Sequence, residues 1–265
     1  PPSAEFAAQA NGTPDLYADA RADRLAFWAR QATELVSWRK PFTEVLDWSQ
    51  APVARWFADG TLNACWNAVD RHVVEGNGDR VAIHFEGEPG DTRTLTRAAN
   101  AMAALGVHTG DRVVIYLPMI PEAVIAMLAC ARIGAPHSLV FGGFSADALR
   151  SRIDDAGARL VITADGGYRR GAASALKPAV DDALAPRDGV ESPVEHVLVV
   201  RRTGQETAMA EHRDVWWHEA TEVADVQHEP VWVEAEHPLF ILYTSGTTGK
   251  PKGILHTTGG YLTQA

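Results

Sequence analysis

The chain has 265 residues, of which 46% are hydrophobic and 22% are charged, and its formal net charge is −10. This size allows one large or two small domains with a sizeable buried core. The negative charge argues against nucleic acids and anionic membranes as main partners, although a single loop of an acidic protein can still bind an anion. Two cysteines cannot form a disulfide framework. We see no signal peptide and no apolar run long enough to cross a bilayer, and therefore expect a cytoplasmic protein.

Residues 1–79 are expected to form a largely helical extension that is rich in tryptophan. Residues 1–13 are rich in Ala and Pro and predict a loose arm, whereas Leu16–Val36 has the apolar spacing of a helix. Four tryptophans follow, and we expect them to pack the extension against the main body. They are Trp38, Trp48, Trp56 and Trp66.

From residue 80 onward, strand and helix patterns alternate, which predicts an α/β fold with helices packed on a mostly parallel sheet. The predicted strands are residues 80–85, 93–96, 111–117, 136–141, 159–163 and 196–200, and the predicted helices are residues 98–105, 121–133, 146–156 and 173–184. Pro121 suits the first turn of its helix and Ser145 is an expected N-cap. Gly134 and Gly157 are expected helix ends, and an acidic connector is predicted from Trp216 onward.

The segment with the clearest chemistry is a loop of hydroxyls and glycines closed by two lysines. It follows the apolar run Phe240–Tyr243, which predicts a buried strand. Glycines let successive backbone N–H groups converge on an anion, as a nucleotide's phosphates require. The hydroxyl donors are Thr244, Ser245, Thr247 and Thr248, the glycines are Gly246 and Gly249, and the cations are Lys250 and Lys252.

This loop differs from the Walker A loop of common ATPases and GTPases. Walker A has four residues between its glycines and a Ser or Thr after its lysine. Here two residues separate Gly246 from Gly249, and Pro251 follows Lys250. Composition alone also allows an ordinary turn between two strands.

Two more loops follow predicted strands, and the carboxyl ends of parallel strands are where open α/β sheets bind ligands. One contains Gly142 and Gly143, which permit close approach of a helix or a ligand to the backbone. The other, Asp165–Gly171, contains Arg169 and Arg170, which could clamp a phosphate. Packing of the glycines and an exposed basic turn are the alternative interpretations.

The run Tyr243–Gly253 resembles the signature of adenylate-forming enzymes, which comprise acyl-CoA synthetases, luciferases and peptide-synthetase adenylation domains. The continuation Leu255–Tyr261 is similar to the acetyl-CoA synthetase branch, the AMP-forming acetate–CoA ligases. The likeness extends upstream through Lys40-Pro41-Phe42, Asp70-Arg71-His72, Pro118–Ala123, Ala129–Ser138 and Phe141–Ser145.

The resemblance implies that the partners are acetate, ATP and CoA, with Mg²⁺, and it implies no oligomeric state. The loop residues Thr244, Ser245, Gly246, Thr247, Thr248, Gly249, Lys250 and Lys252 would hold the phosphates of ATP. Gly142, Gly143, Arg169 and Arg170 would lie at the CoA site. The match is incomplete, because Ala172 stands where relatives often have a second arginine. No residue of this chain is expected to be catalytic or to ligate a metal.

Relatives also have a longer helix after the strand predicted at residues 93–96. Here Thr96 abuts Arg97, and the helix from Ala98 has no good N-cap residue. We therefore expect a segment to be missing at Thr96–Arg97, either deleted from the protein or absent from the given sequence. A deletion would leave core unfilled, which favours the second explanation.

By the same resemblance, the acyl pocket, a ribose-binding aspartate and a small C-terminal domain lie beyond Ala265. Residues 80–265 would then be a partial AMP-binding domain that is inactive alone, and the acyl specificity is not encoded here. A ligase for propionate or another short acid stays open, as does a truncated paralogue that binds ATP or CoA without catalysis.

Other reactive side chains are expected to be structural. His84, His137 and His256 lie in or beside apolar runs and predict satisfied core histidines. Cys130 lies among apolar residues at helical spacing and predicts a buried apolar side chain rather than a nucleophile.

Overall fold

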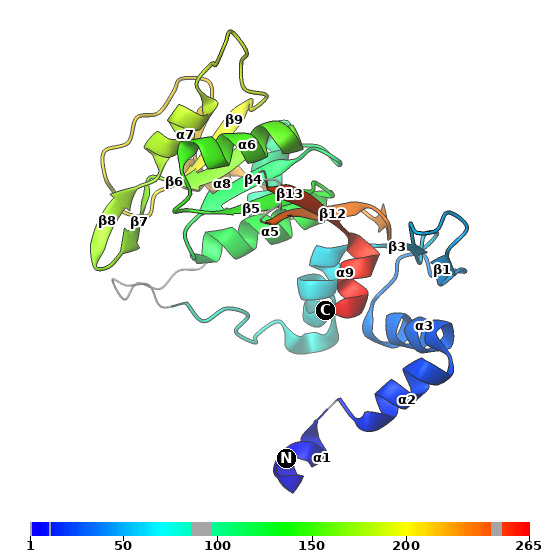
Figure 1. Cartoon of the computed structure of the whole chain (residues 1–265). Helices are drawn as coiled ribbons and strands as arrows, with labels where there is room; N and C mark the ends of the chain where they lie inside the picture. Colours follow the sequence, from blue (N-terminus) through cyan, green and yellow to red (C-terminus); the bar gives the residue numbers. More distant parts are fainter. Residues whose placement is uncertain (1, 11, 86–96, 245–250) are drawn as a thin grey trace.

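A computed structural model describes residues 2–10, 12–85, 97–244 and 251–265 of the chain. Its centre is a seven-stranded sheet with the strand order β10-β9-β6-β4-β5-β12-β13 (Figure 1). The strands are β4 (Val113–Leu117), β5 (His137–Phe141), β6 (Leu160–Ala164), β9 (His196–Val200), β10 (Asp214–Trp216), β12 (Pro238–Thr244) and β13 (Lys252–Thr257). Neighbours are parallel except β12 and β13, which are antiparallel. The predicted α/β fold with a mostly parallel sheet is confirmed.

Helices cover both faces of the sheet. Helix α5 (Pro121–Ile133) connects β4 to β5, and α6 (Ala146–Ala156) connects β5 to β6. These two connections step in opposite directions along the sheet, so right-handed crossovers put the two helices on opposite faces. Helix α7 (Lys177–Leu184) packs beside α6, while α4 (Ala98–Ala104) packs against α5 and α8 (Trp217–Val223). None of the helices in the described residues is long and apolar enough to span a membrane.

The predicted limits of the two central helices are confirmed. Pro121 is the first residue of α5, and Gly134 ends it with a φ of 70°. The hydroxyl of Ser145 accepts a hydrogen bond from the N–H of Ala148 at 3.3 Å, and Gly157 ends α6 with a φ of 59°. Both glycines are in the left-handed region that other residues avoid.

Helix α4 begins without a cap, as the sequence predicted. Arg97 precedes it with a φ of 83° and no side-chain cap hydrogen bond. Ala98, Ala99 and Met102 of this helix are nevertheless buried in the main core. The segment expected to be missing adjoins Thr96, which lies outside the described residues, and stays a prediction.

The N-terminal extension is only partly as predicted. Residues 4–9 form a helix, α1, where a loose arm was expected, because Ser3 caps it by accepting from the N–H of Phe6. The expected single helix over residues 16–36 is two helices, α2 (Pro14–Ala22) and α3 (Arg24–Leu35). They separate at Asp23, whose carboxylate caps α3 through the N–H of Ala26 at 2.9 Å.

Short elements complete the extension and attach it to the rest of the chain. They are β1 (Leu46–Asp47), β2 (Arg55–Trp56), β3 (Thr61–Leu62) and the π-helical turns η1 (Trp66–Asp70) and η2 (Val73–Asn77). Trp38 and Trp56 pack with Phe57 in a small core, which Leu262 of α9 (Thr258–Gln264) also contacts. Strand β3 pairs antiparallel with β11 (Val233–Glu234). The predicted boundary at residues 79/80 stays a prediction.

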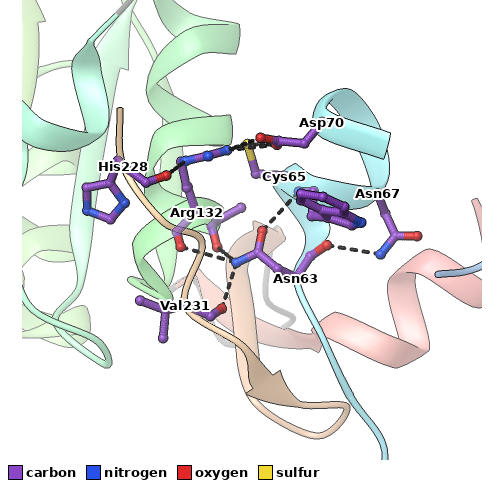
Figure 2. Close-up of polar contacts among 9 residues, drawn as sticks. Asn63, Cys65, Asn67, Asp70, Arg132, His228 and Val231 are labelled. Carbon is purple, nitrogen blue, oxygen red and sulfur yellow. Dashed lines mark hydrogen bonds and ion pairs between the residues drawn. The ribbon is translucent and has the colours of Figure 1, made fainter. Parts of the chain in front are cut away.

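A buried polar cluster joins the extension to α5 (Figure 2). The side-chain amide of Asn63 donates to the backbone carbonyls of Ala131, Arg132 and Val231 at 2.9, 3.1 and 2.8 Å. Arg132 pairs with Asp70 at 2.7 Å and donates to the carbonyl of His228 at 2.7 Å. We call these residues the Asn63 cluster; they connect three segments that are far apart in sequence.

Three other sequence-based predictions were wrong. Residues 80–85 alternate like a strand but form none. The strand predicted at residues 93–96 lies outside the described residues. Ala173–Ala175 belongs to strand β8 (Ala172–Ala175), which pairs with β7 (Gly166–Arg169). Tertiary pairing overrides the helical propensity of its alanines. The predicted connector begins instead with helix α8, over Trp217–Val223.

We predict that Asn63→Ala strongly destabilises the protein. The change removes the donor for three carbonyls at a site where Asn63 is fully buried. Leaving buried polar groups unsatisfied should lower the free energy of unfolding by about 2–4 kcal/mol. Urea unfolding followed by tryptophan fluorescence measures this. Gln9→Ala on exposed α1 is the control, and equal stability of the two variants would contradict the prediction.

Candidate functional site

A cavity of about 550 Å³ opens at the carboxyl edge of the sheet, beyond the ends of β4, β5 and β6. This is where open parallel sheets bind ligands. Its lining combines apolar and aromatic side chains with two arginines. The residues are Phe85, Tyr116, Pro118, Met119, Ile120, Phe141, Gly142, Gly143, Phe144, Gly167, Tyr168, Arg169, Ser174, Ala175, Leu176, Ala179 and Arg202.

Gly142 and Gly143 form one wall of the cavity. A Cβ on Gly142 would lie 3.1 Å from the carbonyl carbon of Leu117, so this residue lets the turn after β5 close against the end of β4. A Cβ on Gly143 would lie 2.9 Å from the ring of Phe141 and 3.6 Å from the guanidinium of Arg169. The glycines therefore pack closely, as one interpretation predicted, and also border the cavity; a ligand contact of either glycine stays a prediction.

Arg169 ends a strand of a hairpin, and Arg170 lies in the turn that follows. Strands β7 and β8 pair from Gly166↔Ala175 to Arg169↔Ala172, so Arg169 ends the first strand and lines the cavity. Arg170 is in the turn with a φ of 54° and is not among the lining residues. The two arginines do not form the adjacent clamp that their sequence suggested, and a CoA contact of either stays a prediction.

Sequence reasoning missed Arg202. It follows β9, and its side chain is buried in the cavity lining. Its guanidinium carbon lies 5.2 Å from the ring centroid of Tyr168 and 5.7 Å from that of Phe85. Its position in the sequence could have indicated it, because Arg202 follows the predicted strand at residues 196–200, as the loop that contains Arg169 follows the predicted strand at residues 159–163. The neighbouring Arg201 instead stacks on Trp216 at 4.5 Å.

The predicted phosphate loop connects β12 to β13. Ser245, Gly246, Thr247, Thr248, Gly249 and Lys250 lie outside the described residues. Thr244 and Lys252 are the last pair of the antiparallel ladder, so they hold the two ends of the loop side by side. The loop is thus anchored on a hairpin at the edge of the sheet.

The stem of this hairpin contacts the cavity wall through Arg152. The hydroxyl of Tyr243 donates to the carboxylate of Asp155 at 2.6 Å, and burial together with this carboxylate raises the pKa of Tyr243. The guanidinium of Arg152 lies 5.4 Å from the ring centroid of Tyr243 and 4.8 Å from that of Phe144. One side chain therefore connects the strand before the phosphate loop to a residue that lines the cavity.

The expectations for the remaining reactive side chains have mixed outcomes. Cys130 is fully buried, and burial raises the pKa of its thiol, as expected for an apolar side chain. His84 is exposed rather than in the core. His256 is half-buried and stacks on Phe240 with ring centroids 4.4 Å apart. His137 is buried, but its Nδ1 has no hydrogen-bond partner in the described part of the chain, so it is not a satisfied histidine.

The fold is an open α/β sheet with a cavity at the carboxyl ends of its parallel strands. The chain belongs to the family described as "AMP-binding enzyme", whose model matches residues 71–265. Residues 13–68 match the model of the "Acetyl-coenzyme A synthetase N-terminus".

Relatives named acetyl-coenzyme A synthetase are similar over nearly the whole chain. The Streptomyces avermitilis protein is 66% identical over 99% of this chain, which spans 41% of that relative. The Mycobacterium bovis protein is 62% identical over 100% of the chain and 42% of its own length. For the Mycolicibacterium smegmatis protein the identity is 60% over 100% of the chain and 29% of the relative. The chain thus spans about two fifths or less of these proteins.

We predict that His137 makes the protein less stable in mild acid. Burial lowers the pKa of His137 to about 4, whereas a histidine in the unfolded chain has a pKa near 6.5. Between these values the unfolded chain binds a proton that the folded chain does not. Stability should therefore fall as the pH drops from about 6.5 to about 4, by roughly 3 kcal/mol at most.

Urea unfolding of the wild type and His137→Phe at pH 7 and pH 5 tests this. The variant should lose less stability than the wild type on acidification, because it lacks the titrating group. His108→Gln, on an exposed histidine, should behave as the wild type does. An unchanged acid dependence in His137→Phe would show that other groups cause it.

Proposed function

We propose that this chain is the N-terminal part of an AMP-forming acetate–CoA ligase. The enzyme would activate acetate with ATP to acetyl-adenylate and pyrophosphate, and then transfer the acetyl group to CoA with release of AMP. One observation carries this proposal: relatives named acetyl-coenzyme A synthetase match from the N-terminal extension to the phosphate-loop hairpin at 66% identity over 99% of the chain.

For the first step, we assign the phosphates of ATP to the loop between β12 and β13. Thr244, Ser245, Thr247 and Thr248 would supply hydroxyl donors, Gly246 and Gly249 would expose backbone N–H groups, and Lys250 and Lys252 would add positive charge. The carboxylate of acetate attacks the α-phosphorus, and pyrophosphate leaves with the electron pair of the broken P–O bond. Donors fixed around the leaving group stabilise its developing charge.

Mg²⁺ would supply further charge neutralisation at the phosphates. Within residues 2–10, 12–85, 97–244 and 251–265, no three His, Cys, Asp or Glu side chains gather to hold a metal.

For the second step, we assign CoA to the cavity at the carboxyl edge of the sheet. Arg169 supplies a cation for a CoA phosphate, and Gly142 and Gly143 leave room along the wall for an extended chain. Arg170 has less support because it lies outside the lining. The CoA thiol attacks the acetyl carbonyl carbon, and AMP leaves with its phosphate oxygen.

Catalysis in this part of the enzyme rests on orientation and charge neutralisation. No described residue is assigned as a general base. The chain spans 41% of the Streptomyces avermitilis relative, so we expect the complete enzyme, and not this chain alone, to carry out both steps. A cytoplasmic location stays a prediction.

Two alternatives make different predictions. A ligase for propionate or another short acid would use the same phosphate loop with a different acyl pocket. A truncated paralogue would bind ATP or CoA without forming an adenylate. The intact mass of the natural protein separates the paralogue from the ligase, since a mass near 28.6 kDa would mean that the chain is complete.

The full-length protein should catalyse acetate-dependent exchange of labelled pyrophosphate into ATP. This exchange reports the first step alone and needs no CoA. Propionate and butyrate should support slower exchange than acetate. Faster exchange with propionate would favour the first alternative, and no exchange with any short carboxylate would sink the ligase proposal.

Arg169→Ala in the full-length enzyme should raise the KM for CoA roughly 10- to 100-fold, the effect of losing a hydrogen bond to a charged group. The rate of pyrophosphate exchange should stay within about twofold, because ATP and acetate do not use the cavity. Arg170→Ala is the matched control and should have a smaller effect. A larger effect from Arg170→Ala would reverse the assignment of the two arginines.

A further inference from the structure

Asp165 is a buried carboxylate at the end of β6, and it does not itself line the cavity. Its Oδ1 accepts hydrogen bonds from the backbone N–H groups of Gly166, Arg202 and Thr203 at 2.6, 2.8 and 3.0 Å. Its Oδ2 accepts from the N–H of Gly204 at 2.7 Å and from that of Thr203 at 3.2 Å. A single side chain therefore fixes the backbone of the loop after β9.

The backbone of Asp165 fixes the β7–β8 hairpin as well. The N–H of Leu176, just after β8, donates to the carbonyl of Asp165 at 3.0 Å, and the N–H of Asp165 donates to the carbonyl of Val200 at 2.9 Å. Gly166 fits this junction because a Cβ there would lie 2.6 Å from the carbonyl oxygen of Ser174. Both ends of the hairpin and the end of β9 thus meet at one residue.

The segments that meet at Asp165 carry the arginines of the cavity. The hairpin carries Arg169 and Tyr168, and the loop after β9 carries Arg202, which stacks on Tyr168. These two cations come from different segments, and Asp165 hydrogen-bonds to the backbone of both segments, at Gly166 and Leu176 beside the hairpin and at Arg202 in the loop after β9. The distance between Arg169 and Arg202 therefore depends on a residue that contacts no ligand in the cavity.

We propose that Asp165 is a positioning residue for the CoA step, because it ties together the two segments from which Arg169 and Arg202 line the cavity, where both cations would face the phosphate groups of CoA. Arg202 then supplies a second cation. The residue just after the hairpin turn, where relatives often have an arginine, is Ala172 in this chain. This proposal rests on the proposed function, since it assigns CoA to the cavity. It adds two residues, Asp165 and Arg202, to those that determine CoA affinity.

Asp165→Asn is the sharpest change because it keeps the size of the side chain. An amide has one acceptor oxygen, whereas the carboxylate uses both. If the amide oxygen keeps the contacts of Oδ1, the amide nitrogen faces the N–H of Gly204, and two donors then meet at the 2.7 Å position. The loop with Arg202 should shift while the sheet core stays intact.

The test measures both steps in the full-length enzyme. Asp165→Asn should raise the KM for CoA at least about tenfold, as expected for lost charge-assisted hydrogen bonds. Acetate-dependent pyrophosphate exchange should stay within about twofold of the wild type. Asp182→Asn, on the exposed side of α7, should change neither. The proposal is overturned if the KM for CoA is unchanged. It is also overturned if CoA use and pyrophosphate exchange are impaired equally, as general destabilisation of the enzyme would cause.

A second variant and a binding measurement keep the outcome clear. If Asp165→Asn does not fold, Arg202→Gln leaves the carboxylate contacts in place and should weaken CoA binding by the same order. Unchanged CoA affinity in that variant contradicts the proposal. Isothermal titration with CoA separates a failure of this proposal from a failure of the proposed function. If the wild type binds CoA and Asp165→Asn binds it more weakly, the role of Asp165 is supported even when no carboxylate supports exchange. If the wild type does not bind CoA, the role of Asp165 is rejected.

Discussion

The buried amide of Asn63 is the interaction on which the arrangement of the whole chain depends. Two of its three acceptors, the carbonyls of Ala131 and Arg132, belong to the last turn of α5, where the helix itself leaves carbonyls without a partner. The N–H of Gly134 also donates to Ala131 at 3.3 Å, and the amide adds a donor to both carbonyls and to that of Val231. The end of α5 is thereby fixed just before β5, which leads into the glycine wall of the cavity. The extension is part of the scaffold of the site.

The loop and the cavity that we assign to the two steps of the proposed reaction both lie at the carboxyl ends of strands of the sheet. The phosphate loop is anchored on the only antiparallel pair among the seven strands of the sheet, and the cavity lies beyond the parallel strands beside it. Arg152 contacts Tyr243 on one side and Phe144 on the other. Arg152 therefore connects the hairpin that carries the predicted phosphate loop to the cavity proposed for CoA.

Local signals explain what could be predicted from the sequence. Pro121 and Gly134 limit α5 because each has a conformational preference that acts within one turn, and apolar runs such as Val113–Leu117 can only be buried strands between helices. Arg169 was found because it follows a predicted strand.

The features that sequence reasoning missed depend on contacts that residue propensities do not encode. The β7–β8 hairpin needs the close approach of Gly166 to Ser174, and Arg202 needs a carboxylate 37 residues earlier to orient its loop. Tertiary pairing of this kind overrides local propensity.

The Asn63 cluster also has a consequence for the order of events during synthesis. Asn63 and its partner Val231 are 168 residues apart, and β3 pairs with β11 at Val233 and Glu234. The extension precedes these partners in the chain, so the contact of Asn63 with Val231 cannot form until Val231 has left the exit tunnel, and the β3–β11 pair cannot form until Glu234 has left it. Helices of the extension can form earlier, since their hydrogen bonds are local. Asn63 can therefore contact the end of α5 early, but the cluster and the β3–β11 pair are completed only after the strands from β4 to β10 have been translated.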